Sequence, residues 1–221
     1  MLKCPEEVRK MTTEERAAGI LAALKEEYPD AECTLEETDP WKLLVQVRLA
    51  AQCTDERVNK VTPALFERFP DCYAMAKASV EEVEEYIHSC GFYRGKARDI
   101  VLTAQRLTEV YGGVVPNTME ELLTLPGVGR KSANLILGDV YNVPGSVVVD
   151  THCIRLSNRM GLVENMKEPA KIEPVLRRLL PPEESNNFCH RLVLHGRAIC
   201  DARKPLCEKC CCSAFCKTMN P

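Results

Sequence analysis

The stretch LPGVGRKSAN spans residues 125–134 and lies between two segments whose apolar residues recur with helical spacing. Pro126, Gly127 and Gly129 compress the connection between these segments. Glycine permits positive φ angles and leaves no side chain between the backbone and a ligand, so the amides before the second helix can face a phosphate. The stretch therefore predicts a helix-hairpin-helix, although on its own it also fits a simple turn between two helices.

Lys131 lies in the first turn of the second helix. The helix dipole disfavours an added positive charge there and so favours the neutral amine, which is a nucleophile, but most lysines in such places are solvated surface groups. Nineteen residues later, VVVDTH (147–152) brings Asp150 to the start of another helix. Asp150 is expected to cap that helix, and a carboxylate there can also stabilise positive charge on a sugar and assist proton transfer at Lys131.

The hydrophobic pattern is helical along nearly the whole chain, which predicts an all-α fold. Two signals place helix starts near residues 40 and 119: the pair Asp39-Pro40, and a capping box formed by Thr118 with Glu121. The segment 41–51 is apolar on almost every side, so we expect a buried central helix. The short run of valines before Asp150 has no partner of alternating pattern and is expected to be an extended lead into the next helix.

The composition is that of an ordinary globular protein, with 28% charged and 45% hydrophobic residues. The net charge of -3 disfavours a nucleic-acid partner, but residues 191–217 contain six Lys and Arg against Asp201 and Glu208, which still allows a basic face. No apolar run approaches the roughly 18 residues that span a bilayer. The N-terminal sequence MLKCPEEVRK has no signal-peptide pattern, and we expect a cytoplasmic protein.

Thirteen cysteines are present, and several cluster in the sequence CDARKPLCEKCCCSAFC (200–216). In a reducing compartment such clusters are read first as metal ligands. The spacing C-x6-C-x2-C-x5-C fits both a structural zinc site and a [4Fe-4S] cluster, since each takes four thiolates, and the intervening Cys211 and Cys212 leave open which thiols bind. The scattered cysteines are expected to be small buried apolar residues: Cys4, Cys33, Cys53, Cys72, Cys90, Cys153 and Cys189.

With these motifs in order, the chain resembles the endonuclease III family of helix-hairpin-helix DNA glycosylases. The resemblance also includes AAQCTD (50–55), GFYRGKA (91–97) and LHGR (194–197), while the first forty residues contain no matching motif. It implies two all-α domains, with DNA bound between them. One is a six-helix barrel over residues 34–144, and the other is an iron-sulfur cluster domain made of residues 1–33 and 145–221.

The resemblance also implies a bifunctional glycosylase and AP lyase that acts on double-stranded DNA with oxidised pyrimidines or abasic sites. Lys131 would attack C1′ of a flipped nucleotide and remain attached as a Schiff base, and β-elimination would then cleave the strand on the 3′ side, with Asp150 mediating proton transfer. A [4Fe-4S] cluster would be bound by Cys200, Cys207, Cys210 and Cys216. A nucleoid-associated monomer with no membrane partner is expected.

The DNA contacts carried over from the family are Gln52, which fills the gap left by the flipped base, the wedge residue Phe92, and the backbone-binding residues Gly127, Gly129, Arg130 and His152. Two departures stand out. The family often has a smaller aliphatic residue at the wedge, so Tyr93 is a second candidate for it, and Cys211-Cys212 replaces the more usual intervening residues.

Two alternative functions remain. Adenine and mismatch thymine glycosylases of the same superfamily share the hairpin and the aspartate but typically lack a lysine at the position of Lys131. A non-catalytic helix-hairpin-helix module with a structural zinc site would use the lysine as one more phosphate contact.

Overall fold

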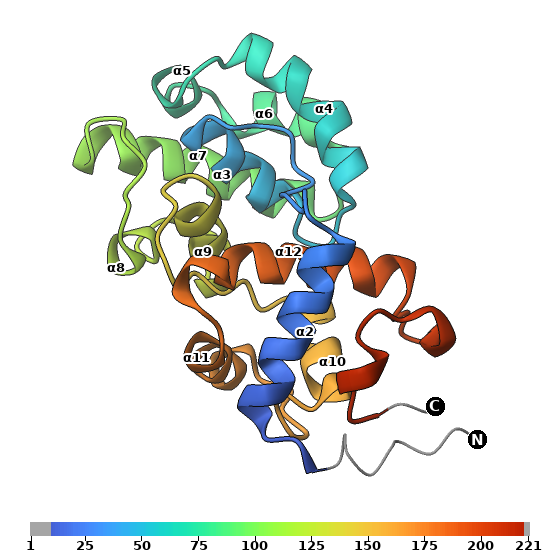
Figure 1. Ribbon diagram of the computed structural model, residues 1–221. Helices are drawn as coiled ribbons and strands as arrows, with labels where there is room; N and C mark the ends of the chain where they lie inside the picture. Colours follow the sequence, from blue (N-terminus) through green and yellow to red (C-terminus); the bar gives the residue numbers. More distant parts are fainter. Residues whose placement is uncertain (1–9, 219–221) are drawn as a thin grey trace. The chain divides into compact units, whose positions relative to one another are not determined.

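The computed structural model describes residues 10–218 of the chain, and within them the regular structure is entirely helical (Figure 1). The prediction of an all-α fold is confirmed. The chain divides into two compact units, one containing residues 33–142 and the other containing the chain up to Glu32 and from Val143 onward. None of the described helices is long and apolar enough to cross a membrane.

The unit of residues 33–142 is built around α3, which contacts α4, α7 and α9. The apolar side chains of α3 are buried, as the sequence predicts for a central helix. Helix α7 is the second central helix of this unit and also packs against α5 and α6. The helices of this unit are α3 (Pro40–Leu49), α4 (Asp55–Arg68), α5 (Cys72–Ala76), α6 (Val80–Ile87), α7 (Tyr93–Val110), α8 (Met119–Leu122) and α9 (Arg130–Asp139).

Side-chain caps fix where the helices of this unit begin. The Asp39 side chain accepts a hydrogen bond from the Lys42 amide at 3.0 Å and starts α3. Thr118 accepts from the Glu121 amide at 3.3 Å and starts α8. Both helix starts are where the sequence predicts them, since each cap satisfies an amide with no partner inside its helix.

The other unit joins the N-terminal helix to the C-terminal part of the chain. Helix α12 contacts α2 and α10, and α2 also contacts α11 and the η3 turn. Gly19 of α2 permits a close approach, because a Cβ there would lie 2.4 Å from the Phe215 ring. The elements are α2 (Thr13–Glu27), α10 (Thr151–Met160), α11 (Pro169–Leu179), η1 (Pro182–Glu184), α12 (Ser185–Ala198), η2 (Cys207–Lys209) and η3 (Ser213–Phe215).

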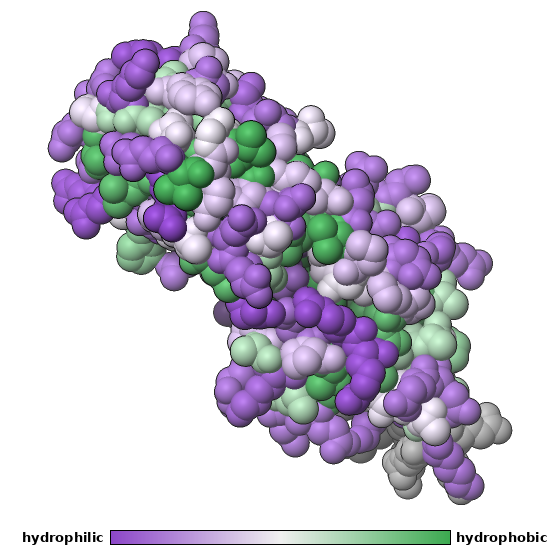
Figure 2. All heavy atoms as spheres, turned by 90° about the vertical axis from the view of Figure 1, so that its left-hand side faces the viewer, coloured by the Kyte–Doolittle hydropathy of each residue, from purple (hydrophilic) through white to green (hydrophobic). Residues whose placement is uncertain are grey.

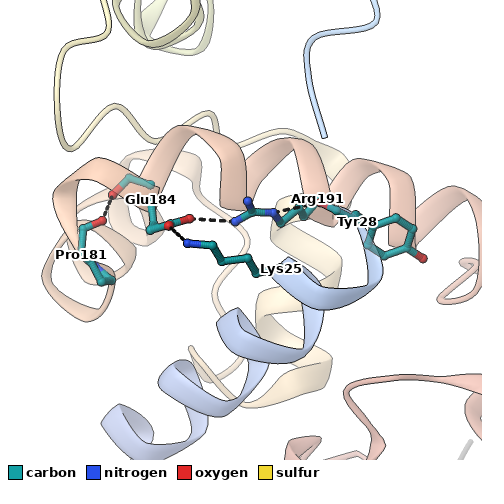
Figure 3. A network of polar contacts seen from close by, with 6 residues as sticks. Lys25, Tyr28, Pro181, Glu184 and Arg191 are labelled. Carbon is teal, nitrogen blue, oxygen red and sulfur yellow. Dashed lines mark hydrogen bonds and ion pairs between the residues drawn. The ribbon is translucent and has the colours of Figure 1, made fainter. Parts of the chain in front are cut away.

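A polar network holds α2 against α12 (Figure 3). The Glu184 carboxylate forms ion pairs with Lys25 of α2 and, at 2.9 Å, with the buried guanidinium of Arg191. Arg191 also donates from Nε to the Tyr28 carbonyl at the end of α2, at 3.2 Å. A buried arginine needs such partners, so the network specifies how the N-terminal helix docks.

Hydrophobic side chains are mostly buried. The face drawn in Figure 2 is largely hydrophilic, and its hydrophobic residues form small, separate patches. Among the described residues Phe92 is the most exposed large hydrophobic side chain, at 75%. Its exposure therefore needs a reason other than packing.

Candidate active site and cysteine centre

The hairpin between α8 and α9 packs against an ion pair formed by Arg48 and Asp99. Gly127 has φ +72°, and a Cβ there would lie 2.5 Å from Arg48 Nε and 2.6 Å from Asp99 Oδ2. Arg48 and Asp99 pair with each other, with Nε 2.8 Å from Oδ2. Both the positive φ and the close approach require glycine at this position. The Thr103 hydroxyl adds a hydrogen bond to the Pro126 carbonyl at 2.9 Å.

Gly129 has a different role from Gly127. It is the N-cap residue of α9 with φ −104°, a conformation open to any residue, and a Cβ there would meet nothing within 4 Å. Gly129 supplies no side-chain cap to α9, and the missing side chain leaves the approach to the first turn of the helix clear. Arg130, the first residue of α9, is exposed.

Lys131 is exposed in the first turn of α9. The opposite face of the helix is anchored in the core by Ala133, Ile136 and Leu137. The amine is therefore carried on a rigid element, next to a helix start whose N-cap residue has no side chain.

Asp150 caps α10, as expected from the sequence. Its Oδ1 accepts a hydrogen bond from the Cys153 amide at 2.7 Å, and the extended run 147–149 before it is buried. Within residues 10–218 its second oxygen, Oδ2, makes no hydrogen bond. One carboxylate can thus hold the helix start with one oxygen and offer the other to a substrate.

His152 is half-buried in the first turn of α10. Its Nδ1 lies 3.2 Å from an Arg155 nitrogen. Gly196, in the LHGR motif, lets α12 approach this ring, because a Cβ there would lie 2.5 Å from His152 Nδ1. Gly196 therefore helps to position His152, for which the family resemblance predicts a DNA contact.

Gln52 and Phe92 lie on two neighbouring loops, since a Cβ on Gly91 would be 3.5 Å from the Gln52 carbonyl oxygen. Both have left-handed backbone conformations, with φ +54° and φ +58°. Such angles are unfavourable for side chains of this kind and are typically found at functional sites. Tyr93 instead packs on His88, with ring centroids 4.6 Å apart. Of the two aromatic residues, Phe92 has the more exposed ring.

Four cysteines line one cavity of about 250 Å³, and they are the four that the sequence analysis selected: Cys200, Cys207, Cys210 and Cys216. Ile199 and Pro205 contribute apolar walls. Cys211 and Cys212 do not line this cavity, although with His195 they form a second group whose ligand atoms lie within 4.8 Å of one another. Four thiols around one apolar cavity are a donor set that can hold a metal ion or a cluster.

The cysteines of the cavity differ in their preference for the thiolate, since burial raises the pKa of Cys207 and of Cys216. The pKa of Cys210 is lowered to about 4, chiefly by a hydrogen bond from Cys212, with His195 acting in the same direction against burial. The His195 Nε2 atom lies 3.3 Å from Cys210 Sγ. Arg159 places a guanidinium nitrogen 3.4 Å from Cys200 Sγ. Because the thiolate is the metal-binding form, Cys212 and His195 favour coordination by Cys210.

Two arginines of α10 hold the cysteine loop, and the sequence analysis missed both. Arg159 donates to the carbonyls of Asp201 at 2.6 Å and Ala202 at 2.7 Å. Arg155 donates to the carbonyl of Cys200 at 3.1 Å. Their signal in the sequence is an Arg-x3-Arg pair that begins three residues after the histidine of VDTH, a spacing that places both side chains on one face of the helix.

Comparison with known proteins gives a consistent family. Residues 45–182 match the sequence model of the HhH-GPD superfamily base excision DNA repair proteins. The chain is 50% identical over 204 residues to endonuclease III of Synechocystis sp., covering 92% of this chain and 93% of the relative. It is 38% identical over 198 residues to endonuclease III of Escherichia coli, covering 90% and 93%.

Solved structures agree. A non-covalent endonuclease III–DNA complex and a trapped endonuclease III–DNA covalent intermediate each have a TM-score of 0.88 and 38% identity, covering 94% of this chain and 97% of theirs. A thermostable thymine-DNA glycosylase, 24% identical, shares the fold with a TM-score of 0.84, covering 93% and 97%. The chain therefore belongs to the endonuclease III family of the HhH-GPD superfamily of base excision DNA repair proteins.

Proposed function

We propose that this protein is a bifunctional DNA glycosylase and AP lyase that removes oxidised pyrimidines from duplex DNA and cleaves the abasic site. The observation that carries this proposal is the exposed Lys131 amine, held beside the open N-terminus of α9. The trapped covalent complex of a relative with DNA supports the same chemistry.

The reaction begins when the hairpin at Gly127, Gly129 and Arg130 binds a phosphate. Gln52 fills the gap left by the flipped base, Phe92 intercalates as the wedge, and His152 adds a further DNA contact. Lys131 Nζ then forms a bond to C1′ as the bond from C1′ to the base breaks, and the base leaves with a proton. The Oδ2 atom of Asp150 stabilises the positive charge that develops on the sugar.

Strand cleavage follows from the same adduct. After Lys131 Nζ loses a proton, the C1′–O4′ bond breaks, O4′ takes up a proton and the sugar ring opens, which leaves a protonated Schiff base between C1′ and Nζ that acidifies the hydrogens on C2′. Removal of one of them, mediated by Asp150, breaks the bond from C3′ to its oxygen and releases the 3′ strand by β-elimination. Hydrolysis of the Schiff base frees the lysine.

We further propose that Cys200, Cys207, Cys210 and Cys216 bind a [4Fe-4S] cluster. Bound there, the cluster would tie together a loop that exposes Arg203, Lys204 and Lys209, and so would shape a surface for the DNA backbone. Purified protein should be brown and contain equal iron and acid-labile sulfide. A colourless, zinc-loaded protein would contradict this proposal.

The proposed organisation is a six-helix DNA-binding barrel over residues 34–144, with a cluster domain formed by the rest of the chain. We propose that the protein acts as a monomer in the cytoplasm, associated with the nucleoid. Sedimentation at increasing protein concentration tests the monomer, and an increase in mass with concentration would count against it.

Borohydride trapping on duplex DNA with an oxidised pyrimidine or an abasic site tests the enzyme. Wild-type protein should form a covalent complex, and Lys131→Ala should not, while it still binds the DNA. Lys60→Ala, which removes an exposed lysine from α4 of the same unit, is the matched control and should trap normally. Wild-type protein that binds DNA but neither traps nor cleaves it would contradict the bifunctional enzyme and leave a monofunctional glycosylase or the non-catalytic module.

A further inference from the structure

Two cysteines of the C-terminal loop are not among the proposed cluster ligands. Cys211 and Cys212 do not line the cavity formed by the other four cysteines of this loop. Their side chains instead meet His195 of α12. The two sulfurs lie 3.7 Å apart, and Cys211 Sγ lies 4.0 Å from His195 Nδ1. All three residues belong to the same compact unit, so a second donor set stands beside the four-cysteine cavity.

The spacing of these donor atoms matches a tetrahedral metal ion. Around zinc, with Zn–S bonds of about 2.3 Å and Zn–N bonds of about 2.0 Å, two sulfurs lie about 3.8 Å apart, and a sulfur and a nitrogen about 3.5 Å apart. The distance between the sulfurs of Cys211 and Cys212 agrees with the first value, and the distance from Cys211 Sγ to His195 Nδ1 is slightly longer than the second. All three ligand atoms lie within 4.8 Å of one another, so small side-chain movements bring them onto one ion.

The Tyr28 hydroxyl lies beside the same imidazole nitrogen. Its oxygen is 3.2 Å from His195 Nδ1, and the tyrosine ring packs edge-on against the imidazole with centroids 5.9 Å apart. An oxygen and a nitrogen that share one tetrahedral zinc lie about 3.3 Å apart. The hydroxyl therefore stands where a fourth donor, an oxygen, is needed.

The second nitrogen of the His195 imidazole also has a partner. His195 is fully buried, and its Nε2 lies 3.3 Å from Cys210 Sγ. A metal-binding histidine typically donates its second N–H to a neighbouring acceptor, which fixes the ring and its tautomer. Cys212 is buried as well, and such a site favours neutrality, which two thiolates and one Zn²⁺ provide.

We propose that His195, Cys211 and Cys212 bind a zinc ion in a second metal site, with an oxygen at Tyr28 as the fourth donor. On binding, the two thiols release their protons to the solvent, and each sulfur and His195 Nδ1 donate an electron pair to the ion. Sulfur donors favour zinc over Mg²⁺ or Ca²⁺, which take oxygen ligands. The ion joins the end of α2, helix α12 and the cysteine loop, and it involves none of the residues proposed for catalysis or for the cluster.

Metal analysis of the complete, iron-containing protein tests the site. The protein is incubated with zinc chloride, dialysed, and analysed for iron and zinc. We expect one zinc per chain without loss of iron. X-ray absorption at the zinc edge, which does not detect iron, should show two sulfur neighbours and two nitrogen or oxygen neighbours. Protein that retains no zinc, or a zinc with either four sulfur neighbours or none, overturns the proposal.

Variants test the ligands one at a time. Cys211→Ala should lower the affinity for zinc about a hundredfold or more, because even the loss of a group that only supports a ligand costs roughly 10–100-fold. Tyr28→Phe should lower it about tenfold. Competition with a chromophoric chelator measures both affinities, and the iron content of both variants should stay at the wild-type value. A Cys211→Ala variant that binds zinc as tightly as wild type contradicts the proposal.

Cys33→Ala is the matched control. Cys33 is half-buried, as Cys211 is, but it lies in the unit of residues 33–142. Both Cys33 and Cys53 are more exposed than the buried residues predicted from the sequence, and Cys4 lies outside the described residues. Cys33→Ala should bind zinc with wild-type affinity. Equal losses of affinity in the Cys33 and Cys211 variants would show that the zinc is not held at the second site.

Discussion

The Asp150 carboxylate combines a structural and a chemical role in one side chain. Its Oδ1 accepts a hydrogen bond from the Cys153 amide and so caps the start of α10, while Oδ2 has no hydrogen bond within residues 10–218. Asparagine is as good an N-cap as aspartate but has no charge. Asp150→Asn should therefore leave the free energy of unfolding nearly unchanged and lower the rate of base excision roughly a hundredfold or more, measured in single-turnover assays.

Asp150→Ala separates the two roles. Without a cap oxygen, this variant should lose about 1 kcal/mol of stability as well as activity. Full excision activity in Asp150→Asn would mean that Asp150 acts only as a cap, and the proposed proton transfer would have to be assigned to another group.

Phe92 has an exposed ring on a left-handed backbone, two features that do not stabilise the free protein. Phe92→Gly removes the ring and relieves a backbone conformation that costs a non-glycine residue roughly 1 kcal/mol. We expect stability to be retained or increased, and affinity for damaged duplex DNA to fall roughly tenfold, because stacking a base on an aromatic ring contributes about 1–3 kcal/mol. Thermal unfolding and binding titrations measure the two effects.

Tyr93→Phe is the matched control for Phe92, since it keeps the ring that packs on His88. Its affinity for DNA should stay at the wild-type value. A larger loss in Tyr93→Phe than in Phe92→Gly would show that the Tyr93 hydroxyl contributes more to DNA binding than the Phe92 ring.

At the scale of the helices, the features that could be predicted from the sequence are those that depend on residues close together in the chain. The starts of α3 and α8 follow from Asp39 and Thr118, because a cap bonds to an amide three residues away. The ion pair beneath the hairpin was not predictable in this way, since Arg48 and Asp99 are 51 residues apart in the chain. Gly127 can be read from the sequence as part of a turn. The reason why this position requires glycine, which is the lack of space beside the ion pair of Arg48 and Asp99, can be seen only in the structure.

The docking of α2 on α12 should depend on pH through Glu184 (Figure 3). The hydrogen bond with Lys25, followed by that with Arg191, holds the pKa of Glu184 below the ordinary glutamate value of 4.5. The stabilisation is thus fully present above the unfolded-state pKa and is lost as pH falls through the lower folded-state pKa. Glu184→Gln should lower the free energy of unfolding by about 2 kcal/mol at neutral pH, a value between those typical of exposed and of buried ion pairs. On further acidification, the free energy of unfolding of this variant should fall less than that of wild type.

Urea unfolding from neutral to acid pH measures this effect. Glu168→Gln is the matched control, because it removes one member of a surface pair with Lys171 in which both side chains are more than 60% exposed. Its stability should follow the wild-type profile. A Glu184→Gln profile parallel to that of wild type down to acid pH would show that the network does not titrate with folding.

For the molecule as a whole, the cysteine spacing placed a metal site within residues 200–216 but could not separate Cys210 from Cys211 and Cys212, and the choice of the four thiols that line one cavity came from the family resemblance. In the structure these two extra thiols lie outside the cavity and group with His195 of α12. His195 precedes Cys211 by 16 residues, so no local pattern records their proximity. Sequence spacing gives distance along the chain, whereas ligand choice depends on which side of the loop each sulfur faces.

Removal of the metal should affect the two units differently. The unit with the cysteine loop has four thiols around a cavity of about 250 Å³, and a metal or cluster bound there would contribute directly to the folding of this unit. Residues 33–142 form a compact unit with its own buried core around α3 and α7. After chelation, hydrogen exchange should accelerate in residues 200–216 and in α10, whose arginines hold that loop, while α3 and α7 keep their protection. Metal-loaded protein in the same buffer is the control. Equal loss of protection in α3 and in the cysteine loop would show that the chain unfolds as a single unit.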